Sequence, residues 1–458
     1  MKKVWIIVAA VAAVAVGVAV FVVTRPERLT RVAATRALGG GEALVVAIPV
    51  GSEAQQKDKT LQLALLGEAG VRWSTALPGD RGLLQTVGGP RMSADAERVY
   101  ALFWASPGES GAPRTVELSA YDRKTGARAW AHPFAVDEKS DFGRDEDVVA
   151  DRGSLLVVGG GTLSALDPAT GAERWHVTDD GATPAGLRLG ASTVALVGGE
   201  GTALYARADG HPLGRLPLVG RVCQLGEALF GATKNKDEAV LATFDPATPP
   251  RVVPNLSLSP QRCAQNAGRI VAFDRTKAAA IDVAAGTVAW MTRTDLQRPE
   301  EVVDGADADV VDLGEIGVAQ LIADPRHDGN GRWLTLDCAT GTLGQRDGKK
   351  LGATAVGSSW VVGQHLAGGD ATTARQVLFD RDGKPVAAWK AGDLQSLQLR
   401  PWSVADGRLW LVDPRRIASL DDVSWTVVDL ASGKPVAGAG SEFIDWLPAG
   451  TVTPSGAE

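Results

Sequence analysis

The segment LSAYDRKTGARAW, residues 118–130, is almost repeated by LSALDPATGAERW, residues 163–175. Each copy runs from an apolar stretch to an Asp, then to a turn ending in Thr-Gly, and reaches a Trp four residues after the Gly. The two Asp residues, Asp122 and Asp167, stand 45 positions apart. A strand–turn–strand unit with a period of about 40–50 residues is typical of the blades of a β-propeller. The repeat therefore predicts an all-β fold.

Each residue of the motif has a local physical reason. An Asp side chain at a strand end accepts hydrogen bonds from backbone N–H groups two or three residues further on, which starts a turn. Gly126 and Gly171 allow the positive φ that closes the turn, because glycine has no Cβ to clash. Trp130 and Trp175 begin the next strand, where a large flat side chain fills the space between neighbouring sheets.

Further copies extend the pattern along the chain and lead us to expect a ring of blades. The clearest ones are Asp282 with Gly286 and Trp290, Asp337 with Gly341, Asp429 with Gly433, and a shorter turn at 380–383 followed by Trp389. Degenerate copies lie at 206–210 and 245–248, and a first copy is expected at 66–70 with Trp73. These nine candidate hairpins favour eight four-stranded blades, with the two chain ends sharing one sheet so that no sheet edge is exposed.

The N-terminus has a different character. Residues 4–23 form an unbroken apolar run after Lys2 and Lys3, long enough to span a hydrocarbon core of about 30 Å as a helix. The run exceeds the core of a usual signal peptide and ends in a poor cleavage site, which favours an uncleaved signal anchor. The expected organisation is a membrane anchor at 1–24, a tether at 25–41, a propeller at 42–450 and a disordered tail at 451–458.

Charge and cysteine content restrict the partners. The net charge of −7 argues against nucleic acid, which requires a basic patch. Basic residues lie on both sides of the apolar run, so the distribution of charge does not favour an outward-facing domain. Three cysteines, Cys223, Cys263 and Cys338, leave two interpretations open: one disulfide with a remaining thiol, or three buried apolar side chains.

Two long acidic segments interrupt the repeat. The segments 136–152 and 294–332 carry most of the insertions, and loops on one rim of a propeller commonly carry binding sites. A charged loop is more often simply solvated, so both interpretations stay open. Trp402 and Trp446 lie outside the repeat positions and offer stacking platforms for a ligand, with core packing as the alternative.

The repeated Asp-x-x-Thr-Gly-x-x-x-Trp unit resembles the repeat of the pyrroloquinoline-quinone (PQQ) type propellers. That family includes quinoprotein alcohol dehydrogenases and the propeller subunit of the bacterial outer-membrane β-barrel assembly machinery. The resemblance covers about residues 42–446 and implies that each repeat Trp docks between adjacent blades. It also implies an extracytoplasmic domain. Fold similarity of this kind does not fix the function.

Signs of chemistry are weak. The vicinal cysteine pair of many quinoprotein enzymes is absent from the sequence. Asp324, Asp328 and Asn330 form an oxygen-rich segment that suits a hard cation, but a Gly-rich hairpin turn explains the same residues. The five histidines are isolated, and residues 159–161 are read as a hairpin turn between strands, since no helix follows to bind phosphate. We expect no catalytic residues, no metal, and neither PQQ nor calcium.

These observations together predict a monomeric, single-pass protein of a bacterial cell membrane, with its propeller in the periplasm or extracytoplasmic space. Its rim loops are expected to bind protein partners, so that the domain acts as a protein-interaction scaffold in the assembly of envelope or outer-membrane proteins. The alternatives are a PQQ-dependent oxidoreductase and a propeller that senses a ligand or binds carbohydrate.

Overall fold

The computed structural model describes residues 29–439 except for loop segments between strands. The segments left out are 51–60, 78–90, 107–113, 137–146, 160–161, 179–185, 236–237, 275, 294–317, 324–331, 348–350, 357–359, 367–373, 381–384, 391–401, 414–422, 431 and 433. The expected anchor at 1–24 and tail at 451–458 lie outside the described residues. Within the described ranges, no helix is long and apolar enough to cross a membrane.

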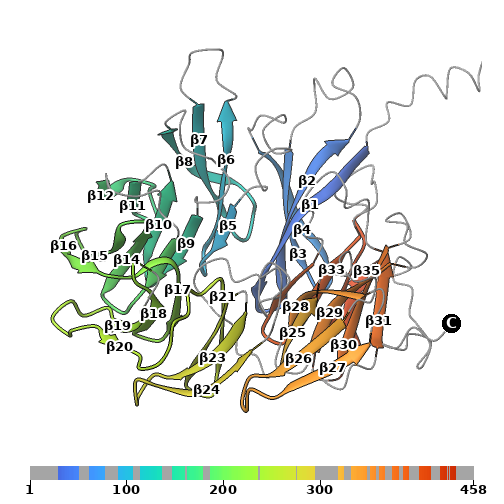
Figure 1. The fold of residues 1–458 in the computed structure, drawn as a ribbon. Coiled ribbons are helices and arrows are strands. Elements are labelled where there is room, and N and C mark those ends of the chain that lie inside the picture. Colours follow the sequence, from blue (N-terminus) through green and yellow to red (C-terminus); the bar gives the residue numbers. More distant parts are fainter. Residues whose placement is uncertain are drawn as a thin grey trace, which may run out of the picture.

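The described strands form nine antiparallel sheets, each built from strands consecutive in the chain. We number these sheets blade 1 to blade 9 in chain order (Figure 1). Blades 1 to 3 contain β1 (Leu29–Gly39), β2 (Glu42–Val50), β3 (Leu61–Gly67), β4 (Gly70–Leu77); β5 (Arg91–Ala94), β6 (Arg98–Ser106), β7 (Arg114–Asp122), β8 (Arg128–Val136); and β9 (Asp147–Asp151), β10 (Ser154–Gly159), β11 (Thr162–Leu166), β12 (Glu173–Thr178).

The next three blades are also four-stranded. They contain β13 (Gly186–Leu189), β14 (Thr193–Gly198), β15 (Gly201–Ala206), β16 (Pro212–Leu216); β17 (Val219–Leu225), β18 (Ala228–Ala232), β19 (Ala239–Thr243), β20 (Arg251–Val252); and β21 (Arg262–Asn266), β22 (Arg269–Phe273), β23 (Lys277–Asp282), β24 (Thr287–Arg293).

Blade 7 has three described strands, and blades 8 and 9 have four each. They contain β25 (Val318–Ala323), β26 (Arg332–Asp337), β27 (Leu343–Asp347); β28 (Leu351–Val356), β29 (Trp360–Leu366), β30 (Ala374–Asp380), β31 (Pro385–Lys390); and β32 (Trp402–Ala405), β33 (Arg408–Val412), β34 (Trp425–Asp429), β35 (Lys434–Ala439).

Burial follows the position of a strand within its blade. Middle strands such as β14 and β18 are buried along their whole length, whereas the last strand β24 alternates between exposed and partly buried residues. A strand packed on both faces reads as a continuous apolar run, as Val194–Val197 does, and a strand with one solvated face alternates. The sequence pattern thus separates the inner layers of each blade from its outer edge.

Neighbouring blades are held together by apolar clusters that form between their faces. In β2, Leu44 and Val46 belong to the cluster shared with blade 2, while Val45 packs into the cluster shared with blade 9. This division follows from the period of two in a strand, which sends alternate side chains to opposite faces. Similar clusters join each successive pair from blade 2 to blade 7. The sheets therefore pack face to face around a ring, as in a β-propeller (Figure 1).

The ring closes differently from the expectation. The expected shared sheet is wrong for the described strands, because blade 1 contains only β1–β4 and blade 9 only β32–β35. The two blades meet by packing: Val45 and Ala64 of blade 1 contact the cluster that holds Trp410 and Val427 of blade 9. We call this contact the closing interface. The expected count of eight blades is not confirmed, since the described strands make nine sheets.

The expected tether at 25–41 is wrong over most of its length. Residues 29–39 form β1, which pairs antiparallel with β2 and is the first strand of blade 1. Gly39, Gly40 and Gly41 form the reversal between these strands, with φ values of 78°, 61° and 75°. Because left-handed backbone is open to glycine at little cost, this glycine run is a hairpin turn. The basic residues that precede this glycine run are the reason why the sequence alone favoured a solvated linker.

The two long acidic segments contain strands as well as loops. Residues 147–151 of the first segment form β9, and residues 318–323 of the second form β25. The remaining parts, 137–146, 294–317 and 324–331, lie outside the described residues. Both insertions are therefore shorter than the sequence pattern suggested.

Candidate functional site

The repeated Asp residues build the turns between the third and fourth strands of their blades. Asp122 Oδ1 accepts hydrogen bonds from the backbone N–H of Lys124 at 3.0 Å and of Thr125 at 2.8 Å. The N–H of Gly126 donates to Asp122 O at 2.8 Å, and the φ of Gly126 is 71°. Asp167 and Gly171 repeat this arrangement, with a φ of 72° at Gly171. The turn is thus specified locally, by hydrogen bonds within five residues.

These hydrogen bonds lower the pKa of both carboxyl groups. The backbone N–H of Thr125 is the main cause of the lowered pKa of Asp122. The side-chain hydrogen bond from Arg174, at 2.7 Å, is the main cause for Asp167, and its pKa falls to about 2. Both groups are stabilised as carboxylates because hydrogen bonds donated to a carboxyl group are stronger when that group is charged. Their role is to hold the turn.

The repeat Trp of one blade docks on the Gly of the next blade's turn. A Cβ on Gly171 would lie 2.5 Å from Trp130 Cε3, so the indole ring lies directly against the glycine backbone. Trp130 Nε1 donates to Pro168 O at 3.0 Å in the same turn. His132, two residues after Trp130, places its Nδ1 3.0 Å from Gly171 O. Glycine is required here both for its positive φ and for the close approach of the ring.

The same docking recurs at three other interfaces. Trp73 lies against Gly126, Trp175 against Gly210, and Trp290 against Gly341, with Cβ-to-ring distances of 2.6–2.7 Å. Trp73 Nε1 donates to Arg123 O at 2.9 Å, and Trp175 Nε1 donates to Arg207 O at 3.1 Å. Each ring therefore connects its own blade to the next one in the chain.

An arginine takes the place of the Trp between blades 5 and 6. The guanidinium carbon of Arg251 lies 2.9 Å from the position of a Cβ on Gly286, where an indole ring lies in the other interfaces. Arg251 Nη2 also reaches Val283 O at 3.4 Å, the carbonyl that corresponds to the acceptor of the indole N–H. A planar guanidinium stacks as an aromatic ring does, which explains the substitution. Sequence reasoning missed Arg251, although it follows the degenerate turn at 245–248.

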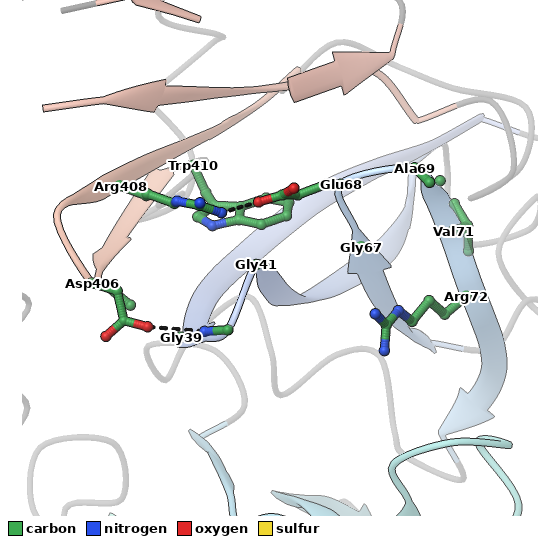
Figure 2. Close-up of a pocket in the computed structure, with 13 residues that line it drawn as sticks. Gly39, Gly41, Gly67, Glu68, Ala69, Val71, Arg72, Asp406, Arg408 and Trp410 are labelled. Atoms are coloured by element: carbon green, nitrogen blue, oxygen red, sulfur yellow. Dashed lines mark hydrogen bonds and ion pairs between the residues drawn. The ribbon is translucent and has the colours of Figure 1, made fainter. Parts of the chain in front are cut away.

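The closing interface carries a pocket. A cavity of about 720 Å³ is lined by three turns, 39–41, 67–72 and 405–408, together with Trp410 (Figure 2). The N–H of Gly40 donates to Asp406 Oδ2 at 2.9 Å across the two blades. Arg408 of blade 9 forms an ion pair with Glu68 of blade 1. The pocket wall is thus polar and rich in glycine.

A second ion-pair group lies at the other side of the pocket. The side chain of Glu42 is 8% exposed and pairs with both Arg72 and Arg123. Arg123 Nη2 lies 2.7 Å from Glu42 Oε2, while the side chain of Arg72 remains 52% exposed. Figure 2 shows Arg72 and Asp406 on opposite sides of the pocket, with Gly41 and Gly67 between them.

The repeat and its packing are matched by a known family. A family model described as outer membrane protein assembly factor BamB matches residues 114–387. The chain belongs to this BamB-like family of PQQ-type propellers. A comparison with curated protein sequences finds no significant match.

Solved structures with the same kind of fold show low sequence identity. BamB from Moraxella catarrhalis aligns with a TM-score of 0.42 and 15% identity, over 77% of this chain and 95% of that one. Quinohemoprotein alcohol dehydrogenase from Comamonas testosteroni aligns with a TM-score of 0.44 and 12% identity, over 84% of this chain and 71% of that one. A eukaryotic initiation factor aligns with a TM-score of 0.52 and 9% identity, over 79% of this chain and 88% of that one. Likeness at these identities concerns the fold alone.

Three further copies of the repeat hold their turns by the same Asp hydrogen bonds. Asp282 Oδ1 accepts from Ala285 N at 2.8 Å, Asp337 Oδ1 from Ala339 N at 2.8 Å, and Asp429 Oδ1 from Ser432 N at 2.7 Å. Gly433 lies outside the described residues.

Trp389 does not share the register of the docking residues. Trp130 pairs with Ala120, directly beside the irregularity in its strand pair. The corresponding position in blade 8 is Ala387, which pairs with Leu378, while Trp389 pairs with Gln376, two pairs further along the strands. The shorter turn at 380–383 misled the spacing argument for this residue.

The predicted cation segment is not tested. Asp324, Asp328 and Asn330 lie outside the described residues, as does Trp446. In the part of the chain that the structure describes, no group of three or more His, Cys, Asp or Glu side chains is placed to hold a metal ion.

The open question of the cysteines is resolved. Cys223 on β17 and Cys263 on β21 form a disulfide between the first strands of blades 5 and 6. Cys338 is buried and takes no part in it. Sequence spacing gave no pairing, because the two cysteines are 40 positions apart and the other three strands of blade 5 lie between them.

Proposed function

We propose that this protein is a membrane-tethered, extracytoplasmic propeller that serves as a protein-interaction scaffold in the assembly of envelope or outer-membrane proteins. The observation that carries the proposal is the match of residues 114–387 to the BamB family model. The mechanism is binding by a rigid disc, without a catalytic step or a resident cofactor.

The packing of the blades suits a scaffold. Indole rings fixed on glycine turns, together with the apolar clusters, leave each blade little freedom relative to its neighbours. A rigid support lowers the entropy lost when its surface loops bind a partner. A scaffold of this kind presents its rim as one surface.

The disulfide supports the extracytoplasmic location. Disulfides persist in oxidising compartments such as the bacterial periplasm and are rare in the cytosol. Cys223 and Cys263 are both almost fully buried, which protects the bond from soluble thiols. The apolar run at 4–23 supplies a membrane anchor in this proposal.

The proposal is tested by chemical crosslinking in native membranes, followed by affinity purification of the full chain and mass spectrometry. We expect barrel-assembly components to be enriched over a control bait that has the same anchor and an unrelated domain. Equal recovery with both baits would overturn the proposal.

Two further measurements address location and cofactor. A C-terminal alkaline phosphatase fusion reports the side of the membrane, and we expect it to be active, as an extracytoplasmic domain requires. Adding PQQ and Ca²⁺ to the purified protein is expected to leave no bound chromophore after desalting. A retained chromophore with dye-linked alcohol oxidation would favour the oxidoreductase alternative.

A further inference from the structure

The closing interface lacks the side chain that fills the other described Trp interfaces. Ala437 of β35 pairs with Val427 beside the strand irregularity, the register at which Trp130 pairs with Ala120 and Trp175 with Ala165. An alanine therefore stands where a docking ring would extend toward the next blade.

The receiving turn of blade 1 is also different. Glu68 and Ala69 reverse the chain between β3 and β4, in place of the longer turn that Asp122 holds in blade 2. A Cβ on Gly70 would find no atom within 4 Å, whereas one on Gly126 would strike an indole ring. Gly40 is equally open. The turn between β3 and β4, which corresponds to the turn that receives a ring elsewhere, is thus uncovered at Gly70, and so is Gly40 in the turn between β1 and β2.

The charges around the cavity favour a carboxylate at one end. Glu42 is a single carboxylate between two guanidinium groups, so Arg72 and Arg123 leave a local excess of one positive charge. Arg72 is the more exposed of the two and lines the cavity. A guanidinium binds a carboxylate through paired hydrogen bonds. The carboxylates of Glu68 and Asp406 already have partners in Arg408 and the Gly40 N–H.

We propose that the cavity binds an extended acidic segment of a partner protein that carries an aromatic side chain. The ring lies over the open glycines, Gly40 and Gly70, and a neighbouring carboxylate pairs with Arg72. The cavity is large enough for one such side chain and its flanking backbone, at about 720 Å³. This inference rests on the proposed scaffold function and names one site through which it acts.

The test is a fluorescence anisotropy titration of the purified full chain with the labelled peptide acetyl-Gly-Glu-Asp-Trp-Glu-Gly-amide. Two comparison peptides replace its Trp by Ala or its three acidic residues by Lys. We expect saturable binding of the first peptide and at least about fivefold weaker binding of either comparison peptide, the loss of roughly 1 kcal/mol of contact.

Three variants locate the binding. Arg72→Ala is expected to weaken binding by about fivefold, as loss of one partly exposed ion pair. Ala69→Trp adds a ring to an exposed position beside the cavity and is expected to weaken binding by about tenfold or more through blocking. The matched control is Arg174→Ala, because Arg174 precedes Trp175 as Arg72 precedes Trp73 but is not one of the residues that line the cavity.

Undetectable binding, or equal binding to wild type, Arg72→Ala and Ala69→Trp with an unchanged melting temperature, would overturn the inference. Repeating the membrane crosslinking with Ala69→Trp separates the two proposals. If wild type and variant recover the same assembly components, the scaffold proposal stands and the site is wrong. If wild type recovers none, the scaffold proposal itself fails.

Discussion

Replacing Gly171 by alanine tests the docking of the Trp rings most directly. The new Cβ would lie 2.5 Å from Cε3 and 2.6 Å from Cδ2 of Trp130, well inside contact distance. The matched control is Gly153→Ala in the same blade. The φ of Gly153 is 73°, against 72° for Gly171, but a Cβ at Gly153 meets nothing within 4 Å.

The magnitude follows from separate contributions to the free energy of unfolding. Left-handed backbone costs an alanine roughly 1–2 kcal/mol in both variants. In Gly171→Ala alone, the displaced ring adds about 1–3 kcal/mol of overpacking. Loss of the hydrogen bond from Trp130 Nε1 to Pro168 O, now 3.0 Å, adds about 1 kcal/mol. We expect Gly171→Ala to lose about 2–4 kcal/mol more than Gly153→Ala.

The assay is urea unfolding followed by far-UV circular dichroism for wild type, Gly171→Ala and Gly153→Ala. The free energies of unfolding are compared with one common value for their dependence on urea concentration. The double variant Gly171→Ala with Trp130→Leu should recover part of the extra stability lost by Gly171→Ala. The shorter Leu side chain removes the overlap between the new Cβ and the indole ring. Equal destabilisation by Gly171→Ala and Gly153→Ala would refute the claim that the ring, and not the backbone alone, demands glycine at this turn.

Three other perturbations test separate contacts. Cys223→Ser removes the crosslink to Cys263 and, from chain entropy over a sequence separation of 40, should cost up to about 4 kcal/mol of stability. Thermal unfolding exposes the buried bond, so reductant present during the melt should lower the melting temperature of wild type and leave that of Cys223→Ser unchanged; equal melting temperatures of wild type with and without reductant would contradict this. The folded pKa of Asp167 lies at about 2, below its ordinary 3.8, so its stabilising contribution is full above that ordinary value and is lost as pH falls toward 2. Asp167→Asn should therefore flatten the acid dependence of the melting temperature over this range, as should Arg174→Ala, and an unchanged profile would exclude the linkage. Arg251→Trp restores the repeat residue and should melt no lower than wild type, whereas Arg251→Ala should melt lower; the reverse order would show that Arg251 does not replace a docking ring.

The turns of this fold are readable from the sequence because they are local. Asp122, Thr125 and Gly126 lie within five residues, and their hydrogen bonds form wherever the chain reverses. The failures have a physical cause too. Trp389 lies two pairs away from the docking register, and spacing counted along the chain does not reveal how two strands pair.

The candidate site could not be predicted from the sequence. Its residues come from turns more than 300 positions apart, such as Glu68 and Arg408. Gly39–Gly41 was read as part of a tether, because nothing nearby in the sequence shows that residues 29–39 pair with β2. Polar pairs between distant segments follow only from the packing of whole blades.

The sequence by itself determined the repeat, the all-β class and the residue types needed at each turn, since these depend on backbone geometry within a few residues. Only the tertiary structure decided which Trp meets which glycine, that Cys223 bonds to Cys263, and that blade 9 meets blade 1 through side-chain contacts and not through a shared sheet. Those outcomes depend on how whole blades pack against one another, because each contact joins residues of two neighbouring blades. At this closing interface Ala437 occupies the register of the docking Trp residues, and the pocket there is lined by segments from both ends of the chain.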